Sequence, residues 1–161
     1  MTQALLGIDI GTSGCKALLI DSKGAVLASQ TETYGLSQPK PCWTEQDPQL
    51  WIDGARKAVA GVLARQPKIE IADIGLSGQM HGLTPLDADD KVLRPALLWN
   101  DQRNGAECAE ITERAGGLEG LLAHTNNRML VGYTGGKIVW MRNHEPELFG
   151  RMTHILNPKD Y

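Results

Sequence analysis

The segment from Leu5 to Asp21 constrains the fold more than any other part of the chain. It reads LLGIDIGTSGCKALLID, in which two apolar runs flank a GTSG turn at residues 11–14. Short runs rich in aliphatic residues, joined by a glycine-bounded turn, predict a β-hairpin. Glycine can adopt positive φ and permits a close approach to the backbone, so the N–H groups of such a turn can converge on an anion. The segment therefore predicts a hairpin whose turn is suited to a phosphate group.

The side chains around this turn add donors and one acid. The candidate phosphate ligands are Gly11, Thr12, Ser13, Gly14 and Lys16, which offer backbone N–H groups, two hydroxyls and an ammonium. Asp9 stands at the end of the first apolar run, where an unpaired buried carboxylate would be costly. We expect Asp9 to face a cation, a donor cluster or solvent, and to position a metal ion beside the phosphate. The alternative is a purely structural turn, and the spacing fits neither the Walker loop nor the dinucleotide motif.

Composition limits the class of protein. The chain has 161 residues, 42% of them hydrophobic and 22% charged, with a formal net charge of −3 and no basic stripe, so we expect one soluble globular domain that does not bind nucleic acid. Three widely spaced cysteines favour a reducing compartment over a disulfide framework. No apolar stretch approaches bilayer length, and no basic segment precedes the first apolar run. These features predict a cytoplasmic protein without membrane partners.

The order of the predicted elements indicates an α/β fold. A third strand is expected at residues 25–34 after a tight turn, which makes an antiparallel three-strand meander with the hairpin. Residues 49–65 carry apolar residues at helical spacing, with Asp47 as the expected N-cap and Pro48 at the first helical position. Residues 69–76 then form a strand, and the intervening helix invites parallel pairing with the hairpin. This order predicts a mixed sheet flanked by helices, as in a ribonuclease-H-like, actin-type lobe.

A second polar cluster follows the strand at residues 69–76. The loop SGQMHG contains Gln79, Met80 and His81, which combine an amide, a thioether and an imidazole between glycines. Hydroxyls of a polyol need paired donors and acceptors, and its carbons need an apolar wall, so these side chains suit a sugar. The alternative is that His81 is a loop histidine bonded to nearby backbone. The four histidines show no metal-ligand spacing.

Several motifs in this order resemble the FGGY carbohydrate kinases, a family within the actin-like ATPases, and among them the xylulokinases. They are DIGTSG at residues 9–14, WTEQDPQLW at 43–51, GQMHG at 78–82, RPALLWNDQR at 94–103 and the terminal PKDY. The resemblance implies a kinase that uses ATP and Mg²⁺ to phosphorylate D-xylulose. Glycerol, gluconate, ribulose or fuculose kinases, and a non-catalytic sugar-binding fragment, remain alternatives.

The resemblance also implies roles for particular residues. Asp9 would support activity near the Mg²⁺-bound phosphates, with the ion held directly or through water. Substrate contacts are implied for Gln79, Met80, His81, Trp99, Asn100, Asp101 and Tyr133. Family members are much longer than this chain, so we expect residues 1–161 to form an incomplete first lobe. The general base and the second lobe with the adenine site are expected beyond residue 161, and the full protein is a candidate homodimer.

Overall fold

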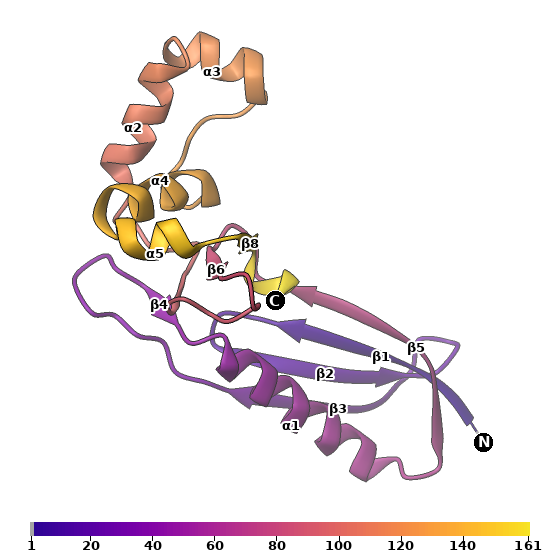
Figure 1. The fold of residues 1–161 in the computed structure, drawn as a ribbon. Helices are drawn as coiled ribbons and strands as arrows, with labels where there is room; N and C mark the ends of the chain where they lie inside the picture. The colour runs from indigo at the N-terminus through magenta and orange to yellow at the C-terminus, as the bar shows by residue number, and fades with distance from the viewer. Residues whose placement is uncertain (1) are drawn as a thin grey trace. The chain divides into compact units, whose positions relative to one another are not determined.

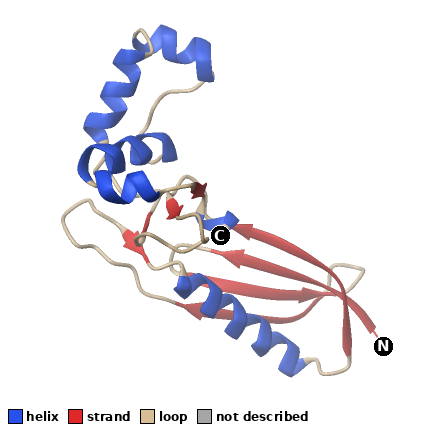
Figure 2. Ribbon diagram, in the orientation of Figure 1, coloured by secondary structure: helices blue, strands red, loops and turns tan. Residues whose placement is uncertain are grey.

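The computed structural model describes residues 2–161, which form two compact units. The sheet unit consists of residues 2–36 and 47–79, and the helical unit of residues 37–46 and 80–161. Figure 1 shows the course of the chain through its elements, and Figure 2 colours them by type. Each unit is described by itself below.

The sheet unit holds one four-stranded sheet and one helix. Its elements are β1 (Thr2–Ile10), β2 (Gly14–Ile20), β3 (Val26–Thr33), α1 (Gln49–Arg65) and β5 (Ile69–Gly78). The strand order is β3-β2-β1-β5, in which β1, β2 and β3 are antiparallel neighbours and β5 is parallel to β1. The predicted meander and the parallel return after the helix are both confirmed.

Helix α1 packs on one face of this sheet. Alternate residues of β1 and β2 point toward it, as expected for the two-residue period of a strand. The buried residues of this core are Ala4, Leu6, Cys15, Ala17, Leu19, Ala28, Ala58 and Val62. The alternation places Asp9 and Lys16 on the opposite face, where both side chains are exposed.

The bounds predicted for α1 are confirmed, but its start and its buried stripe differ from expectation. Pro48 is the N-cap, and the Asp47 carboxylate accepts the Gln49 N–H at 2.9 Å, so Asp47 caps from one residue further out. Leu50 and Leu63 were expected in the apolar stripe but are 36% and 37% exposed. The buried positions are Trp51, Gly54, Ala58 and Val62. Their spacing of three, four and four residues is helical. Ala58 and Val62 were predicted in this stripe correctly, while Trp51 and Gly54 take the places expected for Leu50 and Leu63.

The helical unit contains short strand pairs and most of the helices. Its strands are β4 (Glu45–Gln46), β6 (Thr84–Leu86), β7 (Ala96–Leu97) and β8 (His154–Leu156), paired antiparallel as β4 with β7 and β6 with β8. Its helices are α2 (Gly105–Arg114), α3 (Gly117–Thr125), α4 (Thr134–His144), α5 (Pro146–Arg151) and the 3₁₀ turn η1 (Pro158–Asp160). Among the described residues of the chain, no helix combines the length and apolarity needed to cross a membrane.

The core of the helical unit lies beneath α4. Leu83, Leu97, Trp140 and Met141 are buried together there, and the Trp43 ring meets Trp140 edge-on at 5.5 Å between centroids. Close packing of α4 against α2 depends on a glycine. A Cβ at Gly136 would lie 2.3 Å from Asn104 Nδ2 and 2.6 Å from Cys108 Sγ. The first turn of α4 is therefore held tightly against α2.

Candidate functional site

The predicted phosphate turn is a tight connection between β1 and β2. The Gly11 N–H donates to the Gly14 carbonyl at 3.0 Å, which closes the turn. Neither glycine has positive φ, unlike Gly24, Gly116 and Gly117. Close packing is the reason for glycine here, because a Cβ at Gly14 would lie 2.6 Å from the Glu32 carbonyl oxygen. The predicted hairpin is confirmed, and its glycines serve close approach between strands instead of unusual dihedral angles.

Tyr34 holds this turn from the end of β3. Its hydroxyl donates to the Gly11 carbonyl at 2.6 Å, and its backbone N–H donates to the Ser13 carbonyl at 3.1 Å. Burial, with smaller effects from Cys15 and Asp9, raises the pKa of the Tyr34 hydroxyl well above its ordinary value, so it remains a donor. The ring lies against α1, where a Cβ at Gly54 would be 3.0 Å from it. Tyr34 was not predicted from the sequence, although an aromatic residue at the end of the third strand is a usable signal.

The end of β5 is tied to the same turn. The Gln79 N–H donates to the Ile10 carbonyl at 2.8 Å, and the Thr12 hydroxyl donates to Gln79 Oε1 at 3.3 Å. Parallel pairing of β1 with β5 explains this, since the carboxyl ends of both strands reach the same edge of the sheet. The structure thus brings together two residues that were predicted for different ligands.

Asp9 and Lys16 form a cross-strand pair beside the turn. They are register partners in the β1–β2 ladder, and both side chains are exposed on the face opposite α1. A pocket of about 410 Å³ opens on this face. Its lining residues are Gly7, Ile8, Asp9, Lys16, Leu18, Gly75, Leu76 and Ser77. An adjacent carboxylate and ammonium can serve a bound cation and an anion, respectively.

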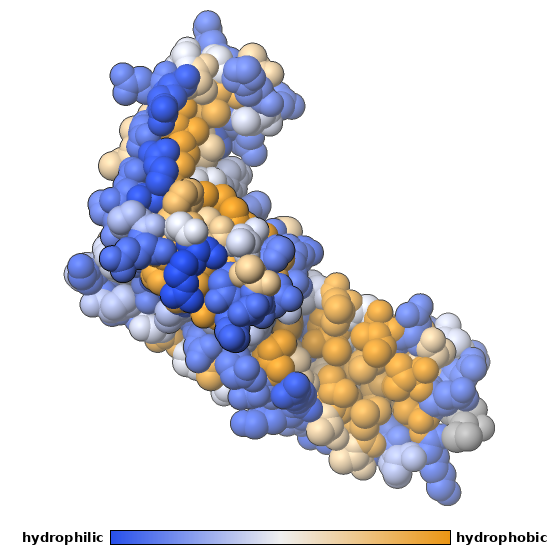
Figure 3. Space-filling model, viewed as in Figure 1, coloured by the Kyte–Doolittle hydropathy of each residue, from blue (hydrophilic) through white to orange (hydrophobic). Residues whose placement is uncertain are grey.

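An apolar surface continues from this pocket along the same face of the sheet. Figure 3 shows apolar side chains gathered over β1 and β5. Leu5, Ile74 and Leu76 are 42%, 55% and 75% exposed there. The charged pair therefore stands at the polar end of an apolar face.

Few side chains of the described residues are placed to bind a metal ion. Within residues 2–161, no group of three or more His, Cys, Asp or Glu side chains is arranged to hold a metal ion. The Asp9 carboxylate is exposed, and it forms no ion pair with any other described residue. Asp9 could thus offer one carboxylate to Mg²⁺, with water or phosphate oxygens as the remaining ligands.

In the helical unit, His81 lies against Tyr133. Their ring centroids are 4.7 Å apart with the planes tilted by 38°. His81 has φ of 62°, in the left-handed region, and its side chain is exposed. Met80 beside it is 53% exposed. An exposed thioether and an aromatic pair at one turn supply apolar surface next to a ring nitrogen that can donate or accept.

A pocket of about 520 Å³ lies in the same unit and is lined by several predicted residues. The lining residues are Trp99, Asn100, Gln102, Met129, Leu130, Val131, Gly132 and Tyr133. Trp99, Asn100 and Tyr133 were expected to contact substrate and are brought together here. Residues 129–131 were not expected, because the loop after α3 has no recognisable motif. Gln102 lies in the RPALLWNDQR motif but was not among the predicted substrate contacts.

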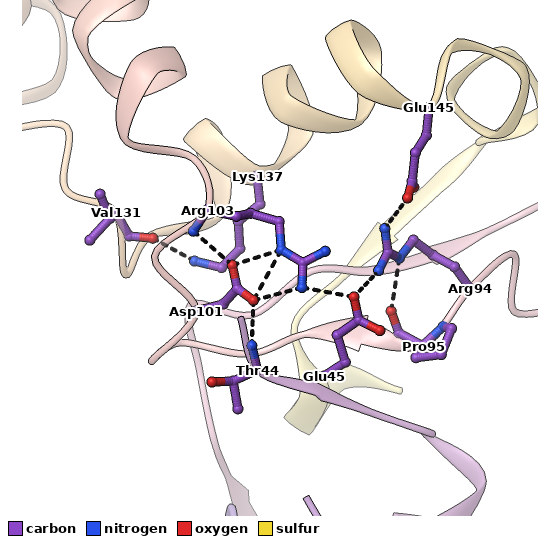
Figure 4. A network of polar contacts seen from close by, with 9 residues as sticks. All are labelled: Thr44, Glu45, Arg94, Pro95, Asp101, Arg103, Val131, Lys137 and Glu145. Atoms are coloured by element: carbon purple, nitrogen blue, oxygen red, sulfur yellow. Dashed lines mark hydrogen bonds and ion pairs between the residues drawn. The ribbon is translucent and has the colours of Figure 1, made fainter. Parts of the chain in front are cut away.

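Asp101 lies elsewhere, in a buried ion-pair network. Its carboxylate accepts the Thr44 N–H at 2.6 Å and the Arg103 guanidinium at 2.8 Å, and its side chain is 0% exposed. Arg103 also bonds Glu45 at 2.7 Å, and Arg94 joins Glu45 to Glu145 (Figure 4). We interpret Asp101 as a residue that fixes the loop carrying Trp99 and Asn100. Asp101 is therefore not included among the substrate contacts proposed below.

Comparison with known sequences identifies related proteins. The model of the FGGY family of carbohydrate kinases, N-terminal domain, matches residues 4–161. The chain is 42% identical over 156 residues to the xylulose kinase of Escherichia coli (strain K12), and 42% identical over 159 residues to that of Bacillus subtilis (strain 168). These alignments cover 97% and 98% of this chain but 32% of each relative. The chain thus spans about a third of the length of these relatives.

Solved structures of sugar kinases are similar to this chain in fold. A xyloylose kinase from Brucella ovis matches with a TM-score of 0.91 at 45% identity, covering 97% of this chain and 32% of that one. The xylulose kinase from Rhodospirillum rubrum also gives 0.91, at 32% identity, over 98% of this chain and 33% of its own. The predicted actin-like α/β fold is confirmed by these neighbours.

Proposed function

Because this chain belongs to the FGGY family of carbohydrate kinases, we propose that the full-length protein transfers the γ-phosphoryl group of ATP to D-xylulose. The product would be D-xylulose 5-phosphate. The observation that carries the proposal is the 42% identity to the xylulose kinase of Escherichia coli over 97% of this chain. The residues that line the pocket of the helical unit offer hydrogen-bonding and apolar groups, both of which a small polyol requires.

The sheet unit would supply phosphate and metal contacts. The backbone of the turn at residues 11–14 and the Lys16 ammonium would hold phosphate oxygens, since both offer N–H donors. Asp9 would bind Mg²⁺ directly or through water. The metal ion would neutralise charge on the phosphates during transfer.

The helical unit would supply sugar contacts. His81 would exchange a hydrogen bond with a hydroxyl, while Met80, Trp99 and Tyr133 would cover carbon atoms. Asn100 would offer a further donor and acceptor. These side chains orient the sugar, and orientation is a main source of rate in phosphoryl transfer.

A coupled assay on the full-length protein tests the proposal. ATP consumption is measured with D-xylulose, D-ribulose, L-fuculose, glycerol and D-gluconate, and the phosphorylated product is identified by mass spectrometry and ³¹P NMR. We expect the highest kcat/KM with D-xylulose. A higher kcat/KM with any other member of the panel would replace xylulose as the substrate, and no turnover with any of them would refute the kinase proposal.

A further inference from the structure

Lys137 is a buried cation in the first turns of α4. Its side chain is 0% exposed, and its Nζ donates to the Val131 carbonyl at 2.6 Å (Figure 4). A second, longer contact of 3.5 Å reaches the Tyr133 carbonyl. Within residues 2–161, Lys137 forms no ion pair with a carboxylate. A buried ammonium is costly unless it is well satisfied, so these two carbonyl contacts must offset much of that cost.

Both carbonyls belong to the segment at residues 129–133 that lines the pocket of the helical unit. Gly132 lies between them, and a Cβ there would be 3.0 Å from the Trp99 carbonyl oxygen. The Tyr133 N–H donates to the Leu130 carbonyl at 2.9 Å and closes a turn. The ammonium therefore holds the backbone on both sides of Gly132, and the turn at this glycine packs closely against the loop that contains Trp99.

The segment that Lys137 holds also contacts the loop that contains His81. The Tyr133 ring lies 4.7 Å from the His81 ring, and the Thr134 hydroxyl donates to the Gly82 carbonyl at 3.1 Å. A displacement of the Tyr133 backbone would therefore move a ring that contacts His81. Lys137 itself does not line the pocket.

The surroundings of Lys137 disfavour its charge on balance, although nearby charged groups act in both directions. Burial lowers the pKa of Lys137 to about 8, while the charges of Asp101 and Cys108 oppose that effect and the nearby Arg103 adds to it. The ammonium form still predominates near neutral pH, where a charged donor binds a carbonyl more strongly than a neutral one.

We propose that Lys137 is a positioning residue for the sugar, which fixes the 129–133 segment and, through Tyr133, the orientation of His81. This inference rests on the proposed function, because it assumes that the pocket receives a sugar. Misplacement of orienting groups by about 1 Å can cost on the order of a hundredfold in rate. Loss of a charge-assisted hydrogen bond corresponds to roughly tenfold or more in the equilibrium between the fixed and the displaced segment, and a smaller population of the fixed form weakens the apparent sugar affinity.

Lys137→Met in the full-length protein tests the proposal, because methionine has a similar shape and no donor. Met141→Ala is the matched control: Met141 is also 0% exposed on α4, one turn further along. The readouts are the KM for D-xylulose, the KM for ATP, kcat, the melting temperature, and hydrogen–deuterium exchange of residues 129–133 without sugar. We expect Lys137→Met to raise the sugar KM about tenfold with little change in the KM for ATP, and to accelerate exchange in that segment. Met141→Ala should lower the melting temperature without either effect.

The outcomes separate the two proposals. Unchanged sugar KM and unchanged exchange in Lys137→Met would overturn the positioning role, even if wild type phosphorylates xylulose. A matching rise in sugar KM for Met141→Ala would overturn it too, because general destabilisation would then suffice. If wild type shows no sugar turnover while exchange accelerates in Lys137→Met alone, the proposed function fails and the anchoring of the segment stands. If Lys137→Met does not fold, Lys137→Gln replaces it. A slowly exchanging lysine ¹⁵N ammonium signal in the wild type would report the hydrogen bond from Lys137 to the Val131 carbonyl. Absence of that signal would count against the proposal.

Discussion

The imidazole of His81 packs against the phenol ring of Tyr133 with 4.7 Å between centroids. The two residues are far apart in sequence, and each stands at a turn: His81 has φ of 62°, and Tyr133 is the N-cap of α4. A ring held on one side by an aromatic partner has fewer orientations open to it. The exposed edge of His81 is therefore well placed to present a nitrogen in a fixed direction.

We predict that His81→Gly weakens sugar binding about tenfold, as expected for loss of one hydrogen bond and its packing, and leaves nucleotide binding nearly unchanged. Glycine accepts the left-handed conformation, whereas alanine, like histidine itself, is strained there by about 1 kcal/mol. Titration calorimetry of both ligands and the melting temperature of both variants check this. A lower melting temperature in His81→Gly with unchanged sugar affinity would make His81 a structural residue.

Much of the fold could be predicted because local signals agreed with one another. Two apolar runs on either side of the GTSG turn correctly predicted the β1–β2 hairpin, and Pro48 marked the start of α1. The buried stripe of α1 was predicted only in part, because Leu50 and Leu63 are more apolar than Gly54. Its buried stripe depends on Tyr34 approaching Gly54, a tertiary contact that no local pattern records.

The candidate site could be predicted only where its residues sit in recognisable motifs. Trp99, Asn100 and Tyr133, which were predicted as substrate contacts, line one pocket, while Asp101 is buried against Arg103. An acid next to an exposed polar residue looks the same in sequence whether it contacts a ligand or an arginine. Lys137 was missed for the opposite reason, since a lysine on a helix is normally solvated.

We predict that Asp9→Asn in the full-length protein reduces kcat by about a hundredfold or more, as for loss of a group that stabilises charge in the transition state, with little change in sugar affinity. Asp9 is exposed on the open face beside Lys16, so the substitution should not disturb the core. Glu70→Gln, which removes another exposed carboxylate of the same sheet, is the control. Steady-state kinetics and sugar titration decide: near wild-type kcat in Asp9→Asn would leave Asp9 without a role in transfer.

We predict that the 161-residue chain by itself does not phosphorylate D-xylulose. It matches the N-terminal domain of the family and spans about a third of the length of its relatives, and we expect the general base in the part of the relatives that it does not cover. The measurement is ATP consumption with and without D-xylulose at high protein concentration, with the full-length protein as the positive control. Sugar-stimulated turnover by the short chain would show that the expected second lobe is dispensable.

The lowered pKa of Lys137 predicts that the free energy of unfolding changes with pH in the alkaline range. The pKa of Lys137 is lowered from its ordinary 10.5 to about 8 in the folded chain. Between these values the unfolded lysine is protonated and the folded one is neutral, so the unfolded state binds more protons and stability rises with pH. Relative to Lys137→Met, the wild-type free energy of unfolding should rise by up to about 3 kcal/mol from pH 8 to 10.5.

Urea unfolding of both proteins across that range measures the difference. Asp101 and Arg103 are present in both proteins, so their contributions largely cancel in the comparison. Cys108 does not cancel, because burial raises its pKa and the charge of Lys137 lowers it, so both proteins carry Cys108→Ala. Lys68→Met, at an exposed lysine, should show no such difference from wild type. A difference between wild type and Lys137→Met that stays flat over the range would mean that the lysine keeps its ordinary pKa.

The contact between α4 and α2 predicts that Gly136→Ala destabilises the protein. Alanine normally stabilises a helix relative to glycine by about 1 kcal/mol, but a Cβ here would lie 2.3 Å from Asn104 Nδ2 and 2.6 Å from Cys108 Sγ. Overpacking of this kind typically costs about 1–3 kcal/mol, so we expect a net loss. Gly135→Ala is the matched control, because its Cβ would meet only the flexible end of Met129 at 3.4 Å. Denaturant unfolding should show lower stability for Gly136→Ala and unchanged or higher stability for Gly135→Ala; equal stability of the two variants would mean that α4 does not pack on α2 as closely as the structure shows.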